Sequence, residues 1–143
     1  MKNFLLFKKI LFYFFIIFAN INLFSQNVPP SITDPDQLRA TQIERQKVFD
    51  SIIEDPTNLE NLFNYANLSI LVGDLEAAIG IFEQMLIYQP DLPRIKLELG
   101  VLYFRLGAFA SAKRYLDDVE NYNPPKEVTE KVSVFLEQIE NET

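Results

Sequence analysis

The fold is decided by residues 59–126, which divide into two halves of equal length: LENLFNYANLSILVGDLEAAIGIFEQMLIYQPDL (59–92) and PRIKLELGVLYFRLGAFASAKRYLDDVENYNPPK (93–126). One spacing of 34 residues separates the equivalent prolines, glycines and small residues of the two halves: Pro56, Pro90 and Pro124; Gly73 and Gly107; Ala78 and Ala112; Ala66 and Gly100. A constant period of this length indicates a repeated structural unit that buries its apolar face by stacking on its neighbours.

Each half has the pattern of two packed helices. Apolar residues recur at helical spacing over residues 59–72 and again over 75–88. Between these segments Gly73 allows a left-handed helix end, and Asp74 can cap the next helix. The small Ala78 lets the second helix approach the first, and Phe82 and Leu116 are expected in the core rather than in a binding site.

A further helix is expected on each side of the two repeats. Asp34 followed by Pro35 is a typical helix start, and residues 34–55 read as the second helix of a degenerate repeat. A capping helix is expected over residues 125–140. The predicted apolar stripes are Leu38, Val48, Phe49, Ile52 and Ile53 in the first helix, and Val128, Val132, Phe135, Leu136 and Ile139 in the second. The sequence thus predicts an all-α fold, a short α-solenoid of helix-turn-helix repeats with flanking helices.

The first 25 residues have the composition of a secretory signal peptide. A basic start with Lys2, Lys8 and Lys9 precedes an apolar run from Ile10, and Ser25 is a suitable small residue before a cleavage site. The alternative is an uncleaved anchor, which would give the chain its one contact with a membrane. Residues 26–33 contain Pro29 and Pro30 and are expected to form an extended linker. We therefore expect an exported protein, located in the periplasm or associated with the cell envelope.

Composition narrows the possible functions. The chain has no Cys, His or Trp, so thiol and histidine nucleophiles and the usual zinc ligand sets are excluded. The formal charge is −7, and residues 26–143 carry ten bases against twenty acids, a net −10 that disfavours nucleic acid. The acids at Asp117 and Asp118 are adjacent on one helix and diverge, which indicates a solvated face rather than a metal site. The sequence predicts no enzyme activity and no cofactor.

The 34-residue period, with small residues where helices cross and a proline at the end of each unit, resembles the tetratricopeptide repeat family. This resemblance implies repeats at 59–92 and 93–126 and a concave groove lined by the first helix of each repeat. The groove positions it assigns are Glu60, Phe63, Asn64, Asn67, Ile70 and Leu71 in the first repeat, and Arg94, Leu97, Glu98, Val101, Phe104 and Arg105 in the second. It implies a protein or peptide partner. The alternative is that Leu71, Leu97 and Phe104 pack against an adjacent helix.

A narrower resemblance rests on residues 89–100, on 104–107 and above all on Asn123-Pro124-Pro125-Lys126-Glu127-Val128. These segments are similar to the periplasmic repeat domain that precedes an outer-membrane β-barrel in the surface lipoprotein assembly modifier family. The resemblance implies the envelope of a Gram-negative bacterium. It also implies an alternative role, as the repeat part of an outer-membrane secretion or surface-assembly system whose barrel is supplied as a separate partner.

Overall fold

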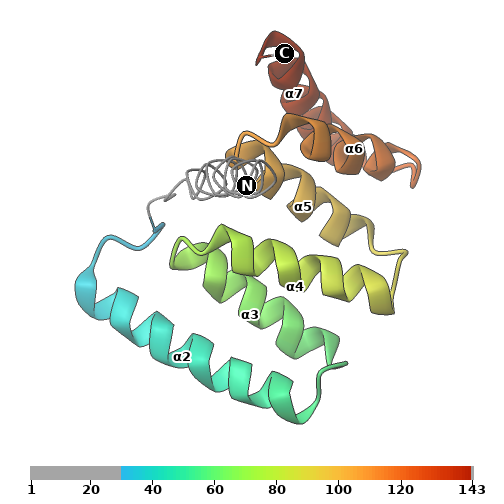
Figure 1. Cartoon of the computed structure of the whole chain (residues 1–143). Coiled ribbons are helices and arrows are strands. Elements are labelled where there is room, and N and C mark those ends of the chain that lie inside the picture. The colour runs from blue at the N-terminus through green and yellow to red at the C-terminus, as the bar shows by residue number, and fades with distance from the viewer. Residues whose placement is uncertain (1–29, 143) are drawn as a thin grey trace, which may run out of the picture.

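The computed structural model describes residues 30–142, so the predicted signal peptide and most of the linker lie outside the described residues. Over this range the chain forms six helices and no strands, which confirms the all-α prediction (Figure 1). Their bounds are α2 Pro35–Glu54, α3 Leu59–Leu71, α4 Leu75–Tyr88, α5 Pro93–Arg105, α6 Phe109–Glu120 and α7 Lys126–Glu142.

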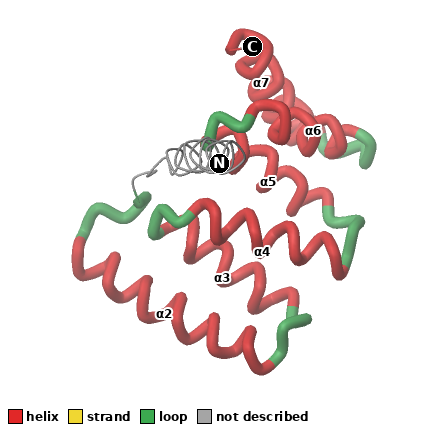
Figure 2. The backbone as a smooth tube through the Cα atoms, viewed as in Figure 1, coloured by secondary structure: helices red, strands yellow, loops and turns green. Residues whose placement is uncertain are grey.

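The helices stack in chain order. Each helix packs against the next one in sequence, and short loops join them (Figure 2). The last helix, α7, lies across the end of the stack and contacts both α5 and α6. Two helical hairpins, α3–α4 and α5–α6, thus form the centre of the fold, with α2 and α7 covering its two ends.

Polar caps and prolines define where the helices begin. Asp34, Asn58 and Asp74 each accept a hydrogen bond from a backbone N–H two or three residues later, at 2.9, 3.1 and 3.2 Å, which satisfies a donor that the helix leaves unpaired. Pro35 and Pro93 occupy the first position of α2 and α5, where the missing N–H costs nothing.

The turns inside the two hairpins have the same geometry. Gly73 and Gly107 adopt φ values of 85° and 71°, in the left-handed region that glycine enters without strain. After each glycine, the next N–H donates to the carbonyl five residues earlier, at 2.8 and 2.9 Å. The glycines therefore end α3 and α5 as the sequence predicts. They turn the chain so that the next helix, α4 or α6, runs back along the first.

Small residues sit where the paired helices approach most closely. In the first hairpin Ala66, Ala78 and Phe82 are fully buried. In the second, Gly100 lies against Leu116 so closely that a Cβ at residue 100 would be 2.7 Å from the Leu116 Cγ. The prediction that these positions form helix crossings is confirmed by this burial.

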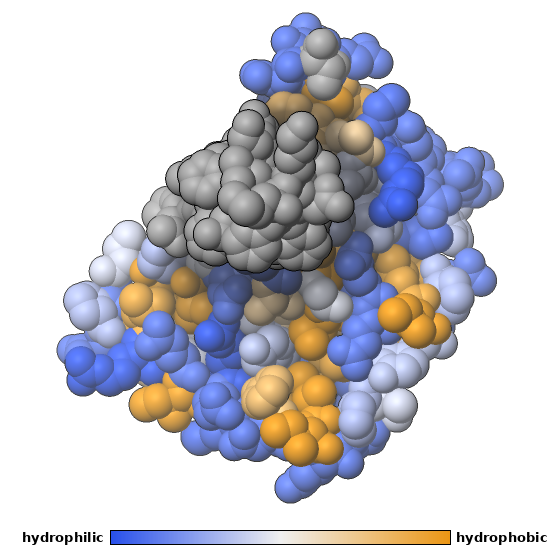
Figure 3. All heavy atoms as spheres, in the orientation of Figure 1, coloured by the Kyte–Doolittle hydropathy of each residue, from blue (hydrophilic) through white to orange (hydrophobic). Residues whose placement is uncertain are grey.

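The apolar stripe predicted for the last helix is confirmed in α7, and the stripe predicted for the first helix is partly wrong in α2. In α7, Val132 and Ile139 are buried and the other three predicted residues pack against them. In α2, Val48 and Ile52 meet the core, but Ile53 is 65% exposed. Because α3 is the one helix of residues 30–142 that packs against α2, much of the α2 surface is left uncovered by this part of the chain. Figure 3 accordingly shows apolar surface in separate patches among hydrophilic side chains.

Candidate functional site

The residues assigned to a groove by resemblance lie on α3 and α5, and we call the surface they form the α3/α5 face. On α3, Asn64 is exposed, and its side-chain amide makes no hydrogen bond within the described residues. Asn67 is half-buried on the same side of the helix, one turn further along. These amides can each donate to and accept from a ligand backbone.

The far end of α3 is less available than the sequence suggests. Ile70 packs against the core, and the Leu71 carbonyl accepts a hydrogen bond of 3.1 Å from the backbone N–H of Ser31. The described end of the linker therefore already contacts this end of the face. The Leu71 side chain is 40% exposed, and Glu60, at the opposite end of α3, is exposed.

Phe63 and Arg94 bring the two helices together. The Arg94 guanidinium carbon lies 4.6 Å from the centroid of the Phe63 ring, a cation–π contact. The same ring lies 5.9 Å from the ring of the buried Phe82, so Phe63 is anchored in the core. The structure thus places Asn64, Phe63 and Arg94 around the amino-terminal halves of α3 and α5.

The carboxyl-terminal half of α5 corrects the predicted groove. The Phe104 ring lies 5.1 Å from the ring of Phe135 on α7 and 5.7 Å from that of Phe109, between ring centroids. Leu97 packs in the same cluster. Phe104 is thus half-buried and packs against α7, which agrees with the alternative that it contacts an adjacent helix. Of the other predicted residues on α5, Glu98 and Val101 are half-buried and Arg105 is exposed.

A pocket of about 290 Å³ opens where α5 begins, between the end of α6 and the start of α7. Its walls are mainly apolar: Pro93, Leu97, Val119, Pro124, Pro125 and Val128. Arg94, Tyr122 and Asn123 complete the lining. Asn123 adopts a φ of 48°, in the left-handed region that Asn tolerates better than most residues, and this turns the chain from α6 into α7.

The positive charge at this pocket comes from Arg94. In the stretch from residue 30 to 142, Arg94 forms no ion pair, and it is exposed. The neighbouring base on α5, Lys96, is by contrast paired with Asp118 at 2.5 Å. Arg94 is therefore the charged group of the pocket that is available to an anion.

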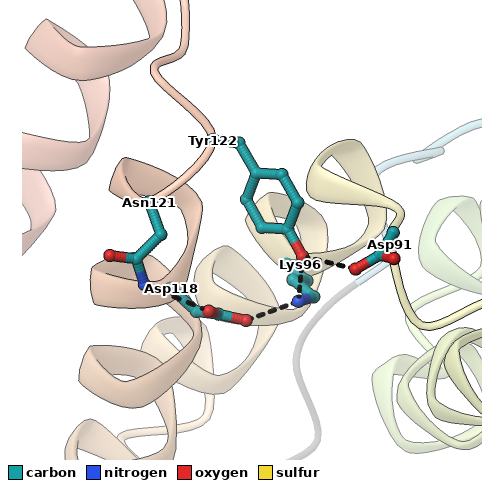
Figure 4. A network of polar contacts seen from close by, with 5 residues as sticks. All are labelled: Asp91, Lys96, Asp118, Asn121 and Tyr122. Atoms are coloured by element: carbon teal, nitrogen blue, oxygen red, sulfur yellow. Dashed lines mark hydrogen bonds and ion pairs between the residues drawn. The ribbon is translucent and has the colours of Figure 1, made fainter.

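A polar network fixes one wall of the pocket (Figure 4). The Lys96 ammonium donates to Asp118 on α6 and to the Tyr122 hydroxyl at 2.7 Å, and that hydroxyl donates to Asp91 at 3.1 Å. Asn121 donates to the second oxygen of Asp118 at 3.3 Å. The network joins the loop before α5 to the end of α6, and it holds the Tyr122 ring against the Lys96 ammonium at 4.7 Å from the ring centroid.

The network shifts two pKa values. The hydrogen bond from Lys96 is the main reason that the pKa of Asp118 lies below its ordinary value. Burial acts to lower the pKa of Lys96, but its hydrogen bonds to Asp118 and Tyr122 outweigh that effect and raise it. Both groups are therefore held in their charged forms.

A second polar cluster joins the two hairpins. Glu83 on α4 accepts hydrogen bonds from the hydroxyls of Tyr103 at 2.8 Å and Tyr115 at 3.2 Å, and the two rings stack with centroids 5.7 Å apart. Burial, followed by the Glu83 hydrogen bond, raises the pKa of Tyr103 to about 12. This cluster holds α5 and α6 against α4.

Acidic side chains do not gather into a metal site within residues 30–142. The helices of this range are all too short or too polar to cross a membrane.

The pocket was missed by sequence reasoning. The sequence places Pro124 at the end of a repeat and Pro125 and Val128 in the capping helix, and it makes no prediction for Tyr122. The available signal was the pair of prolines, because two fixed φ angles at a repeat boundary make the loop between the helices rigid. Arg94 and Leu97 are about thirty residues away in sequence, so their place in the same pocket could be seen only in the structure.

Comparison with known proteins supports the repeat fold. Residues 70–129 match the family model described as tetratricopeptide repeat. Among solved structures, the Yersinia enterocolitica type III secretion chaperone SycD, crystallised in complex with a peptide of the translocator YopD, has a TM-score of 0.65. The two sequences are 16% identical over 74% of this chain and 84% of that chain, so the likeness concerns the fold. No curated protein matches the chain. These findings leave the resemblance to the surface lipoprotein assembly modifier family a prediction.

Proposed function

We propose that this chain is a non-enzymatic protein-binding module that holds a peptide segment of a partner on the α3/α5 face. The observation that carries this proposal is the arrangement around Arg94. The Arg94 guanidinium, which has no ion-pair partner among residues 30–142, contacts Phe63 of α3 and lines the mainly apolar pocket at the start of α5. The exposed Asn64 amide follows Phe63 on the amino-terminal half of α3. Helix-lined sites for peptides combine apolar anchors with a few polar groups that fix orientation in this way.

The fold provides a rigid support for such a site. Phe63 is anchored on Phe82, and Tyr122 is held by Lys96. Side chains that are already ordered lose little entropy when a ligand binds, which favours affinity. The likeness to a solved chaperone with a bound peptide agrees with the proposal, although at 16% identity it supports the fold and not the ligand.

We also propose that the chain works in the cell envelope. The support is the composition of residues 1–25, with three lysines, no acid and an apolar run. The alternative role with an outer-membrane barrel is supported by sequence resemblance alone, so we place the binding of a peptide segment first.

A selection from a random peptide library tests the proposed function. The full chain is used as bait, and enriched peptides are measured against the wild type and against Asn64→Ala. We expect Asn64→Ala to weaken binding about three- to tenfold, the usual range for one lost interface hydrogen bond. Asn141→Ala, which removes an exposed amide from the far end of α7, is the control and should have no effect. A library that yields no binder, or binders insensitive to Asn64→Ala, would argue against this face.

A further inference from the structure

We infer that the pocket at the start of α5 takes one apolar side chain of an internal peptide segment, and that Arg94 pairs with an acidic side chain next to it. This inference rests on the proposed function and specifies its ligand. The inference concerns the pocket and Arg94, whereas the test of the proposed function concerns Asn64. An experiment can therefore contradict one of these two claims and leave the other standing.

The size and lining of the pocket set the apolar part of the ligand. At about 290 Å³ the pocket is close to the lower limit of ligand sites, which are about 300–1,000 Å³, so it has room for a side chain of leucine size. Leu97, Val119 and Val128 supply aliphatic walls, and Pro124 and Pro125 fix the loop that closes one side. A preformed apolar site of this kind gains affinity by taking apolar surface out of water.

The positive charge of Arg94 at the edge of the pocket indicates that the ligand carries an acidic residue. Arg94 is exposed and lacks an ion-pair partner in the described part of the chain, while Phe63 holds it by the 4.6 Å contact. A positioned guanidinium binds a carboxylate through two parallel hydrogen bonds. An acidic residue beside the apolar anchor therefore matches the site, although the protein as a whole is acidic.

The lining also indicates which carboxylate is recognised. Chain-terminal carboxylates are typically captured by clusters of backbone N–H groups. Pro93, Pro124 and Pro125 have no backbone N–H, so the pocket is poor in such donors. An Asp or Glu side chain within a continuous segment needs only the guanidinium. The structure thus favours an internal acidic-apolar segment over a peptide end.

Blocked tripeptides test this inference directly. Acetyl-Glu-Leu-Glu-amide carries both features and no terminal charge, and it is titrated into the isotope-labelled full chain while amide NMR spectra are recorded. Asn123 and Val128 are the reporters, since the neighbouring prolines have no amide signal. We expect saturable shifts at both residues. Acetyl-Glu-Ala-Glu-amide should bind about tenfold more weakly or worse, because most of the buried apolar surface is lost. Acetyl-Gln-Leu-Gln-amide should bind about three- to fivefold more weakly, the range for an exposed ion pair.

Substitutions of single arginines test whether the preference for Glu peptides over Gln peptides comes from Arg94. Arg94→Gln should bind the Glu and Gln peptides equally, and Arg94→Lys should restore part of the preference for Glu. Arg39→Gln, the same change at an exposed arginine of α2 outside the α3/α5 face, is the matched control and should leave the preference unchanged. Because Arg94 and Arg39 are exposed, thermal melts of both variants should match the wild type.

Three results would overturn the inference. One is the absence of shifts at Asn123 and Val128 at millimolar peptide, and another is a preference for Glu that survives Arg94→Gln. The third is tighter binding of acetyl-Gln-Leu-Gln with a free terminal carboxylate than of acetyl-Glu-Leu-Glu-amide, which would contradict recognition of an internal segment. In each case library peptides that depend on Asn64 would leave the proposed function standing.

Discussion

The close approach of α5 and α6 predicts that Gly100→Ala destabilises the protein although alanine is the better helix former. An added Cβ would lie 2.7 Å from both Cγ and Cδ2 of Leu116, well inside van der Waals contact. Leu116 is fully buried and its branch carbon is involved, so it cannot turn aside freely. Overpacking of this kind costs about 1–3 kcal/mol. Replacement of a mid-helix glycine gains about 0.5–1 kcal/mol, so the net loss should be about 1 kcal/mol.

Gly80→Ala is the matched control. Gly80 is exposed within α4, and a Cβ there would meet nothing within 4 Å, so this variant should gain the full helix propensity. The free energies of unfolding of both variants are measured by urea denaturation followed by circular dichroism. Both variants gain the same helix propensity, so this gain cancels when they are compared. The difference between their free energies of unfolding should therefore equal the overpacking cost of about 1–3 kcal/mol. Equal stabilisation by the two substitutions would refute the proposed tight crossing at Gly100.

Three further predictions follow from the packing, the Lys96 network and the N-terminal sequence. Phe104→Ala should lower the free energy of unfolding by about 2–3 kcal/mol, because Phe104 packs against α7, and an unchanged urea midpoint would contradict that packing. Since Lys96 lowers the pKa of Asp118, the pair stabilises the fold above the ordinary carboxyl pKa and this contribution is lost as the pH falls through the lowered value. Asp118→Asn should therefore be less stable than the wild type near neutral pH, by about 1 kcal/mol or less, and the gap should close in acid. N-terminal sequencing of the chain from an envelope extract should show a start at or near Gln26, whereas a start at Met1 would indicate a retained anchor.

Much of the fold could be predicted because its determinants are local. Gly73 and Gly107 end helices through backbone conformation, and Asp74 and Pro93 begin them through hydrogen bonding and a fixed φ. These features act within one turn, so a repeated sequence produces repeated turns. The period also identified the buried crossings, since Ala78 and its equivalent in the second hairpin occupy the same place.

The binding face was harder to predict because exposure depends on neighbours. Phe63 and Phe104 are both assigned to the groove by resemblance, yet Phe63 contacts the exposed Arg94 and Phe104 packs against α7. In the same way Ile53 is exposed because α2 has a single neighbour among the helices of residues 30–142. A helical period shows which residues share a side, but not which helix covers that side.

The central claim is that a partner peptide binds to the α3/α5 face, and its most direct test is a map of binding on the labelled chain. A library-selected peptide is titrated while amide NMR spectra are recorded. The account predicts that the largest shifts occur at Asn64, Arg94 and Val128, with little change on α2. Shifts concentrated on α2, or on the outer side of α6 around Lys113, would contradict it.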